Sequence, residues 1–214
     1  MKQKKYWLVS SVACLSVLML NSQGAWGLIG GSGHDFSADP WSNGEICLPC
    51  HTPHNADTTM TDAPLWNHEV NLAQVYTIYS SPTMDYTVNQ PGNVSKACLS
   101  CHDGTIAVDS FTTGMGAGTT MIGTLNPLAD LTTDLSDDHP IGIDWSTGLH
   151  TTFGFAQCAA CHPGVIGVDP PIVSVYNDRM ECPTCHDVHN KMGFPKLVRV
   201  TMAGSQLCLT CHDK

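Results

Sequence analysis

The sequence predicts a mostly irregular fold, with short α-helices at five repeated motifs and minimal β-structure. The motif Cys-x-x-Cys-His occurs five times among 214 residues. After the N-terminal leader, only about 37 residues remain for each copy, too few to build a conventional core around every one. Residues 28–43 are rich in Gly and Ser, and residues 111–135 lack periodicity, so both are expected to be loops. Residues 75–79, with aromatic and β-branched side chains, are expected to form a short strand or an extended segment.

The repeated motif has the spacing of the attachment signal for c-type haem. On a helical turn, residues i, i+3 and i+4 share a face. Both thiols can therefore bond the vinyl groups along one porphyrin edge, while the imidazole faces the iron. The five copies use ten of the eleven cysteines and leave Cys14. Zinc would need four ligands, usually as two separated pairs, and a disulfide framework would need no histidine at a fixed place, so we expect five haems c per chain.

Each motif assigns two thioether cysteines and one proximal iron ligand. The expected thioether cysteines are Cys47, Cys50, Cys98, Cys101, Cys158, Cys161, Cys182, Cys185, Cys208 and Cys211. The expected proximal ligands are His51, His102, His162, His186 and His212. Ser95 and Ser205 precede two of the copies and are expected to cap the helices that carry them. Because the chain is short for five cofactors, we expect the core to consist of stacked haems.

Six further histidines are candidates for the distal position on the irons: His34, His54, His68, His139, His150 and His189. Five haems need five distal ligands, so the count allows two histidines at every iron and leaves one over. His54 and His189 each follow a proximal histidine by three residues. They are too close to reach the far face of the same haem, so we expect each to bind a neighbouring haem. His150 has no motif around it, but it lies shortly before the third copy.

Methionine is the alternative axial ligand, and it would raise the reduction potential of the haem. The candidates are Met115, Met121 and Met180. Because six histidines are available, we expect the methionines to pack against porphyrin faces instead. Ligation by two histidines predicts low reduction potentials.

The first 27 residues predict a signal peptide. Three lysines among the first five residues form its positive start, and residues 7–20 are an apolar stretch too short to be an ordinary membrane span. Cleavage is expected after Gly27, which leaves residues 28–214 as one pentahaem domain. An acylated Cys14 is the alternative, although the apolar stretch continues past it. Export to the periplasm or the cell exterior agrees with covalent haem attachment, which occurs outside the cytoplasmic membrane.

The charge of the chain after the signal peptide restricts its partners. Residues 28–214 contain six Lys and Arg against nineteen Asp and Glu, a formal charge of −13. Nucleic acid and anionic lipid both bind basic surfaces. We therefore expect no nucleic-acid partner, and no membrane association once the signal peptide is removed.

Two doubled units are visible in the spacing of the motifs. They cover residues of about 45–105 and 180–214, and both begin with Cys-x-x-Cys-His-x-x-His, whereas the third copy, at 158–162, lies between them. Residues 182–212 resemble the doubled-CxxCH class of multihaem c-type cytochromes.

Three further segments are similar to small multihaem cytochromes of metal-reducing bacteria: Cys-His-Thr-Pro-His at 50–54, Pro-Leu-Trp-Asn-His at 64–68 and Asp-Asp-His-Pro at 137–140. Some relatives in that group assemble into extracellular electron-conducting filaments. The resemblance implies a head-to-tail homopolymer as one assembly, for which we expect His34 to bind a haem of the next subunit. It also implies other redox proteins or extracellular electron acceptors as partners.

The function expected from these features is electron transfer without bond chemistry. An enzyme would need an open coordination position at one iron. A motif without its histidine, or too few distal histidines, would indicate such a position, and the sequence has neither. Two alternatives remain. One is a soluble periplasmic electron donor to a reductase, which differs from a filament subunit only in assembly. The other is a multihaem reductase of nitrogen or sulfur oxyanions.

Overall fold

The computed structural model describes residues 29–84, 86–114, 116–144 and 176–212. Several of the expected features lie outside the described residues: the signal peptide, the third motif with Cys158, Cys161 and His162, the distal candidate His150, and Met115.

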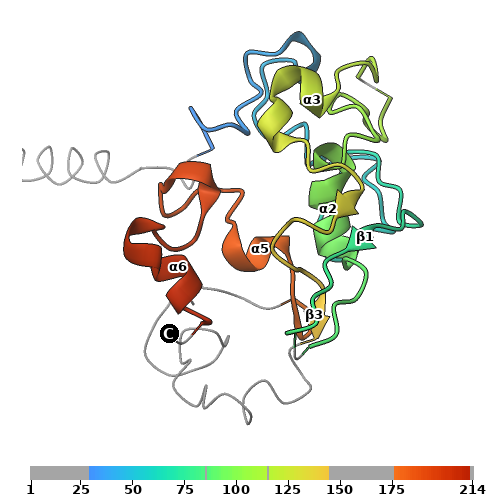
Figure 1. Ribbon diagram of the computed structural model, residues 1–214. Helices are drawn as coiled ribbons and strands as arrows, with labels where there is room; N and C mark the ends of the chain where they lie inside the picture. The colour runs from blue at the N-terminus through green and yellow to red at the C-terminus, as the bar shows by residue number, and fades with distance from the viewer. Residues whose placement is uncertain (1–28, 85, 115, 145–175, 213–214) are drawn as a thin grey trace, which may run out of the picture.

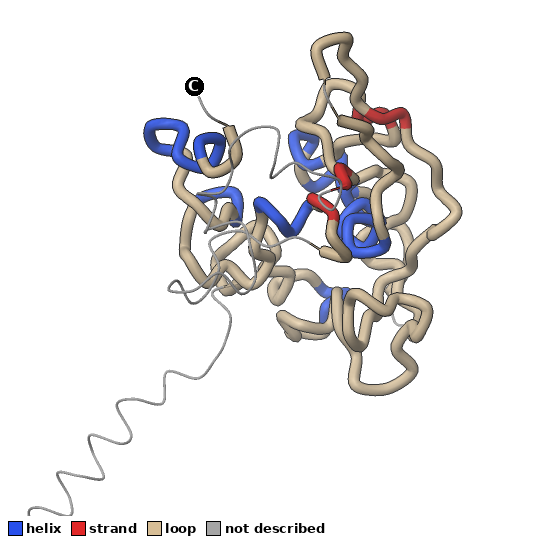
Figure 2. Tube along the Cα trace, turned by 90° about the horizontal axis from the view of Figure 1, so that it is seen from below, coloured by secondary structure: helices blue, strands red, loops and turns tan. Residues whose placement is uncertain are grey.

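Short helices and two-residue strands are joined by loops throughout the described chain (Figure 2). The α-helices are α2 (Asn93–His102), α3 (Ile122–Leu125), α5 (Cys182–Cys185) and α6 (Gln206–Leu209). The 3-10 helices are η1 (Pro40–Ser42), η2 (Pro127–Ala129), η4 (Pro195–Leu197) and η5 (Ala203–Ser205). The predicted fold, mostly loop with few short helices and minimal β-structure, is confirmed for this part of the chain. Helices occur at the second, fourth and fifth motifs, whereas the first motif forms a turn.

The β-structure consists of two separate pairs. Strand β1 (Thr77–Ile78) pairs in parallel with β2 (Asp134–Leu135), and β3 (Ile143–Asp144) pairs antiparallel with β4 (Arg179–Met180). Strand β1 falls inside the extended segment predicted at residues 75–79. Both pairs join segments that lie far apart in the sequence, so they connect loops rather than build a sheet.

Helix α2 is the longest described helix, with 10 residues, and it lies between the loops of the first half of the chain and α5 (Figure 1). It begins after Gly92, not after Ser95 as predicted. Ser95 is fully buried inside the first turn, where its hydroxyl donates to Glu181. Helix α6 does begin directly after Ser205, but the side chain of Ser205 makes no capping hydrogen bond. Among the described residues, no helix is long and apolar enough to span a bilayer.

The described residues form three small apolar clusters. Their buried members are Ile143 and Met180; Met60, Ala63, Trp66 and Ala97; and Tyr76, Leu99 and Leu135. A domain of ordinary composition has one contiguous core. Because each cluster is so small, packing between side chains alone gives this part of the chain little stability, in line with the expectation that cofactors complete the core.

Candidate haem-binding sites

The described chain contains four of the five motifs, and each forms a helical turn. The backbone N–H of the motif histidine donates to the carbonyl of the first cysteine in the first, fourth and fifth motifs, at 2.8, 3.1 and 2.8 Å. The second motif is the C-terminal half of α2. Since i and i+4 are joined by this bond, both cysteines and the histidine lie on one side of the turn, as c-type attachment requires.

Three proximal histidines are held by a backbone carbonyl at Nδ1. The bonds run from His51 to Pro64 at 2.7 Å, from His102 to Ala129 at 2.7 Å, and from His186 to Lys196 at 2.9 Å. A carbonyl only accepts, so Nδ1 must carry the hydrogen, and Nε2 keeps a free lone pair. This is the arrangement that orients a metal-binding imidazole and fixes its tautomer. The donor set of these turns therefore fits a haem c iron.

Three pairs of histidine rings have the separation expected for two ligands of one iron. Their centroids lie 5.9 Å apart for His34 and His102, 6.4 Å for His51 and His189, and 6.2 Å for His139 and His212. Two metal–nitrogen bonds of about 2 Å, together with about 1.1 Å from each nitrogen to its ring centre, give a separation of about 6 Å. Each pair joins one proximal candidate to one distal candidate, at a separation that would accommodate one iron between them.

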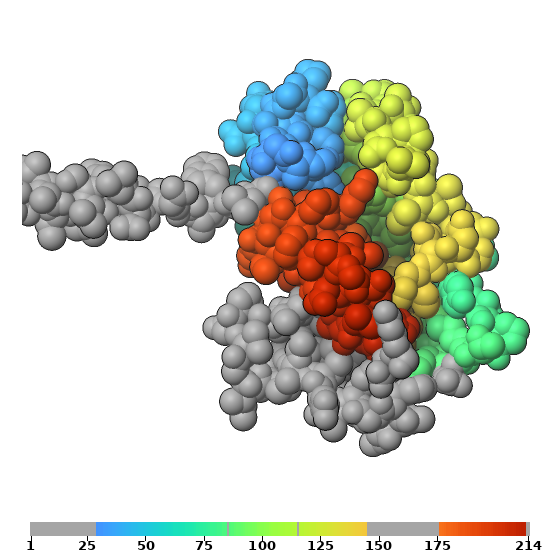
Figure 3. Space-filling view, turned by 60° about the vertical axis from the view of Figure 1, so that its left-hand side comes forward, coloured from blue at the N-terminus to red at the C-terminus, as the bar shows by residue number. Residues whose placement is uncertain are grey.

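The distal candidates come from other parts of the chain than the histidines they face. His189 follows the fourth motif, but its ring lies near parallel to that of His51 in the first motif, at 17°. The two segments are in contact: in Figure 3 the N-terminal part of the described chain, in blue, lies against residues 176–212, in orange to red. His54, the counterpart of His189 after the first motif, is exposed, and its ring is not paired with another histidine among the described residues.

His68 differs from the other described candidates because its ring is enclosed by protein. It is 1% exposed. Nδ1 lies 2.7 Å from the carbonyl of Glu69 and 3.0 Å from the hydroxyl of Ser100. Nε2 lies 2.9 Å from the carbonyl of Ala107 and 3.4 Å from Sγ of Cys101. Both ring nitrogens are thus engaged with neighbouring protein groups.

Burial changes the protonation of several site groups. Burial, with smaller contributions from the neighbouring His102 and His186, lowers the pKa of His34 to about 4. Burial also lowers the pKa of His189, with the carboxylate of Asp187, 4.0 Å from its Nδ1, acting in the opposite direction. Both imidazoles are therefore neutral at neutral pH, which is the form that binds a metal.

Three of the motif cysteines lie in surroundings that disfavour a charge. Burial raises the pKa of Cys50 and of Cys185 to about 11, and raises that of Cys101 further still. A thioether sulfur carries no charge, so an environment that opposes a thiolate suits an attached cofactor.

The first and fourth motifs belong to two copies of one local structure. After the motif, the chain loops out and returns antiparallel to it: His51 pairs with Trp66, and His186 pairs with Val198. The residue before each return partner has a positive φ, 55° at Leu65 and 57° at Leu197. The sequence showed the shared Cys-His-x-x-His, but not the returning segment.

A side chain on the returning segment closes each copy. Asn67 donates from Nδ2 to the carbonyl of Leu48 at 2.7 Å, and Arg199 donates from Nε to the carbonyl of Pro183 at 2.7 Å. Leu48 and Pro183 occupy the same place, directly after the first cysteine of the motif. Two different residue types therefore fix equivalent turns, which is why no shared letter marked them in the sequence.

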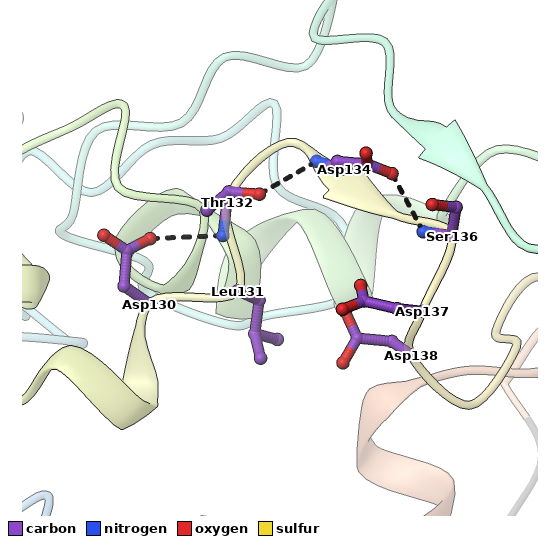
Figure 4. A pocket seen from close by; sticks show the side chains of 7 residues that line it. All are labelled: Asp130, Leu131, Thr132, Asp134, Ser136, Asp137 and Asp138. Atoms are coloured by element: carbon purple, nitrogen blue, oxygen red, sulfur yellow. Dashed lines mark hydrogen bonds between the residues drawn. The ribbon is translucent and has the colours of Figure 1, made fainter.

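An acidic surface pocket of about 470 Å³ lies on the segment between Ala129 and His139 (Figure 4). It is lined by Asp130, Leu131, Thr132, Asp134, Ser136, Asp137 and Asp138. Two of the carboxylates accept hydrogen bonds from backbone N–H groups of the same loop, at Thr132 and Ser136. The loop thus connects the carbonyl that holds His102 with the distal candidate His139.

Comparison with known protein families finds a match to the doubled CXXCH motif over residues 175–214, the part that holds the fourth and fifth motifs. Neither the curated proteins nor the solved structures give a match. The family match supports a c-type cytochrome class for this chain, with covalent binding of haem c and electron transfer as the associated activity.

Proposed function

We propose that this protein is an electron carrier with five covalently attached haems c, each ligated by two histidines. The observation that carries the proposal is the pairing of proximal and distal histidine rings at about 6 Å, where the proximal Nδ1 of two of the three pairs is already bonded to a carbonyl. With both axial positions taken by the chain, an iron has no open position for a substrate. The proposal is therefore a carrier rather than a reductase.

The roles of the chain's residues follow from the site geometry. The cysteines of each motif hold the cofactor by two thioether bonds, and the motif histidine binds from Nε2. Backbone carbonyls fix the orientation of three of these imidazoles. When bound, haem supplies an iron that alternates between Fe(III) and Fe(II), which is the one-electron chemistry of the class.

We assign distal ligands from the ring pairs. His34 serves the second motif, His189 the first, and His139 the fifth. His68 is the histidine left over in this assignment, because Nε2 can donate to the carbonyl of Ala107 while Nδ1 accepts from the hydroxyl of Ser100. His54 and His150 then remain for the third and fourth haems.

The proposed setting is respiratory electron transport in the periplasm or outside the cell, after removal of a signal peptide. Partners are other redox proteins or extracellular acceptors, not nucleic acid. Two assemblies fit this role, a head-to-tail homopolymer and a soluble carrier that donates electrons to a reductase. His34 is no longer proposed as the ligand that crosses between subunits, because its ring lies 5.9 Å from that of His102 in the same chain.

The proposal is tested by producing the exported protein in a host that attaches c-type haems. Pyridine haemochrome analysis and the mass of the intact chain should both give five haems. The reduced protein should pass its electrons to a soluble cytochrome acceptor, but should not consume nitrite, hydroxylamine or sulfur oxyanions. Steady turnover of any of these substrates would replace the carrier with the reductase.

A further inference from the structure

The second and fourth motifs meet at a buried polar joint between α2 and α5. Ser95 of α2 donates its hydroxyl to Oε2 of Glu181 at 2.5 Å and accepts the backbone N–H of Cys182 at 2.9 Å. The backbone N–H of Gly92 donates to the same carboxylate at 3.1 Å. Ser95 and Glu181 are 0% and 2% exposed. The start of one motif helix is therefore bonded directly to the start of the other.

The carboxylate of Glu181 is surrounded by donors. Besides Ser95 and Gly92, the guanidinium of Arg179 faces it, with Nη1 3.7 Å away. Burial raises the pKa of Glu181, with a smaller contribution from Asp62, whereas Ser95, Gly92 and Arg179 oppose that rise. Hydrogen-bond donors and a positive charge stabilise a carboxylate relative to the protonated carboxyl, so these neighbours favour the ionised form of Glu181.

Gly92 shows how tightly the joint is built. A Cβ at this position would lie 2.7 Å from Oε1 of Glu181. Only glycine leaves room for the helix start to approach the carboxylate so closely. The first cysteines of the two motifs lie close to these bonds in the chain: Cys98 is one helical turn after Ser95, and Cys182 directly follows Glu181. The joint thus lies at the attachment points of two cofactors at once.

We infer that Glu181 is a positioning and charge-tuning residue shared by the haem sites of the second and fourth motifs. It holds the two attachment turns at a fixed separation, and its charge lowers the reduction potentials at both sites. A buried negative charge stabilises Fe(III), which carries one more positive charge than Fe(II), and buried charges are weakly screened. The inference rests on the proposed function, since it assumes haem at both motifs.

The test compares full-length, haem-loaded Glu181→Gln with the natural protein. Glutamine keeps the shape and accepts from Ser95, but it has no charge. Reduction is followed haem by haem through the paramagnetically shifted methyl resonances. We expect two of the five potentials to rise, the other three to stay in place, and the spectrum to remain low-spin. The matched control is Glu69→Gln, which removes an exposed carboxylate and should move none of them.

Glu181→Asp separates the two roles, because it keeps the charge but shortens the reach to Ser95. It should lower the unfolding temperature and leave the two potentials near their natural values. If Glu181→Gln does not accumulate with five haems, Arg179→Gln takes its place. It removes the positive charge 3.7 Å from the carboxylate, so the same two potentials should fall.

The shared role of Glu181 would be overturned if Glu181→Gln shifted all five potentials equally, or shifted none of them by more than Glu69→Gln does. A natural protein without five low-spin haems would instead overturn the proposed function, so the two failures are distinguishable.

Discussion

At the scale of single residues, the hydrogen bonds of each imidazole distinguish the proposed iron ligands from His68. A proximal histidine such as His51 has one nitrogen held by a carbonyl, and its ring faces a second histidine at about 6 Å. His68 instead has both nitrogens bonded to protein and almost no exposed surface. The sequence gives residue types but not hydrogen-bond partners, so it could not distinguish His68 from the other distal candidates.

Replacing His68 with Phe should therefore leave the spin state unchanged. The carbonyl that accepts from the single N–H of His68 and the hydroxyl of Ser100 would lose their partner, so we expect a loss of about 1–3 kcal/mol in the free energy of unfolding. Electron paramagnetic resonance of the oxidised protein should show five low-spin haems. The comparison variant is His34→Ala, for which one haem of five should become high-spin. A high-spin haem in His68→Phe would return His68 to the set of ligands.

At the scale of elements, the first and fourth motifs repeat one unit, a haem-binding turn closed by a returning segment. The turn and its proximal histidine could be predicted, because cysteines and histidines at fixed spacing mark them. The returning segment could not, since backbone carbonyls such as that of Pro64 leave no trace in the sequence. Ser95 was misassigned as a cap for a similar reason: its partner, Glu181, lies 86 residues away.

The left-handed residue of the returning segment gives a direct test of this unit. Leu65 has φ of 55° and is 55% exposed. A non-glycine residue in this conformation costs about 1–2 kcal/mol. Leu65→Gly should therefore raise the free energy of unfolding by about 1 kcal/mol, measured by chemical denaturation of the haem-loaded protein. Leu65→Ala keeps the Cβ, so it should not raise the free energy of unfolding. Equal effects of the two variants would contradict the claim that the backbone at Leu65 is strained.

The closing side chains offer a matched pair of variants. Asn67→Ala and Arg199→Ala each remove the donor to an equivalent carbonyl. Each should cost about 1 kcal/mol or more in the free energy of unfolding, because each side chain also makes a second hydrogen bond: Arg199 donates to the hydroxyl of Tyr176, and Asn67 accepts from that of Thr113. Each should perturb the methyl resonances of its own haem alone. The control is Thr119→Ala at an exposed site. If it lowers the free energy of unfolding as much as the other two variants do, the hydrogen bonds of Asn67 and Arg199 have no specific role.

At the scale of the whole molecule, the described protein has three small apolar clusters and few regular elements. The irregular fold could be predicted from the motif count and the absence of periodicity. The pairing of His189 with His51, from motifs 135 residues apart in the printed sequence, could not, because it depends on how distant loops fold back. Because these clusters are small, we propose that attached cofactors provide much of the folding free energy.

Loss of one haem attachment site should therefore prevent the protein from accumulating, rather than only lower its activity. We expect Cys182→Ala combined with Cys185→Ala to abolish accumulation of the exported chain, measured by immunoblot of the periplasmic and secreted fractions. Cys14→Ala, outside every motif, should accumulate normally. A stable, compact form of the double variant, seen by circular dichroism and size-exclusion chromatography, would contradict a core completed by haem.

The central claim is that the chain supplies both axial ligands of every iron. Near-infrared magnetic circular dichroism of the oxidised protein, at neutral pH and with the haem content measured on the same sample, tests it most directly. The account predicts that all five haems give the low-spin charge-transfer band of two histidine ligands. A band from histidine and methionine, or a high-spin fraction corresponding to one haem in the intact protein, would contradict it.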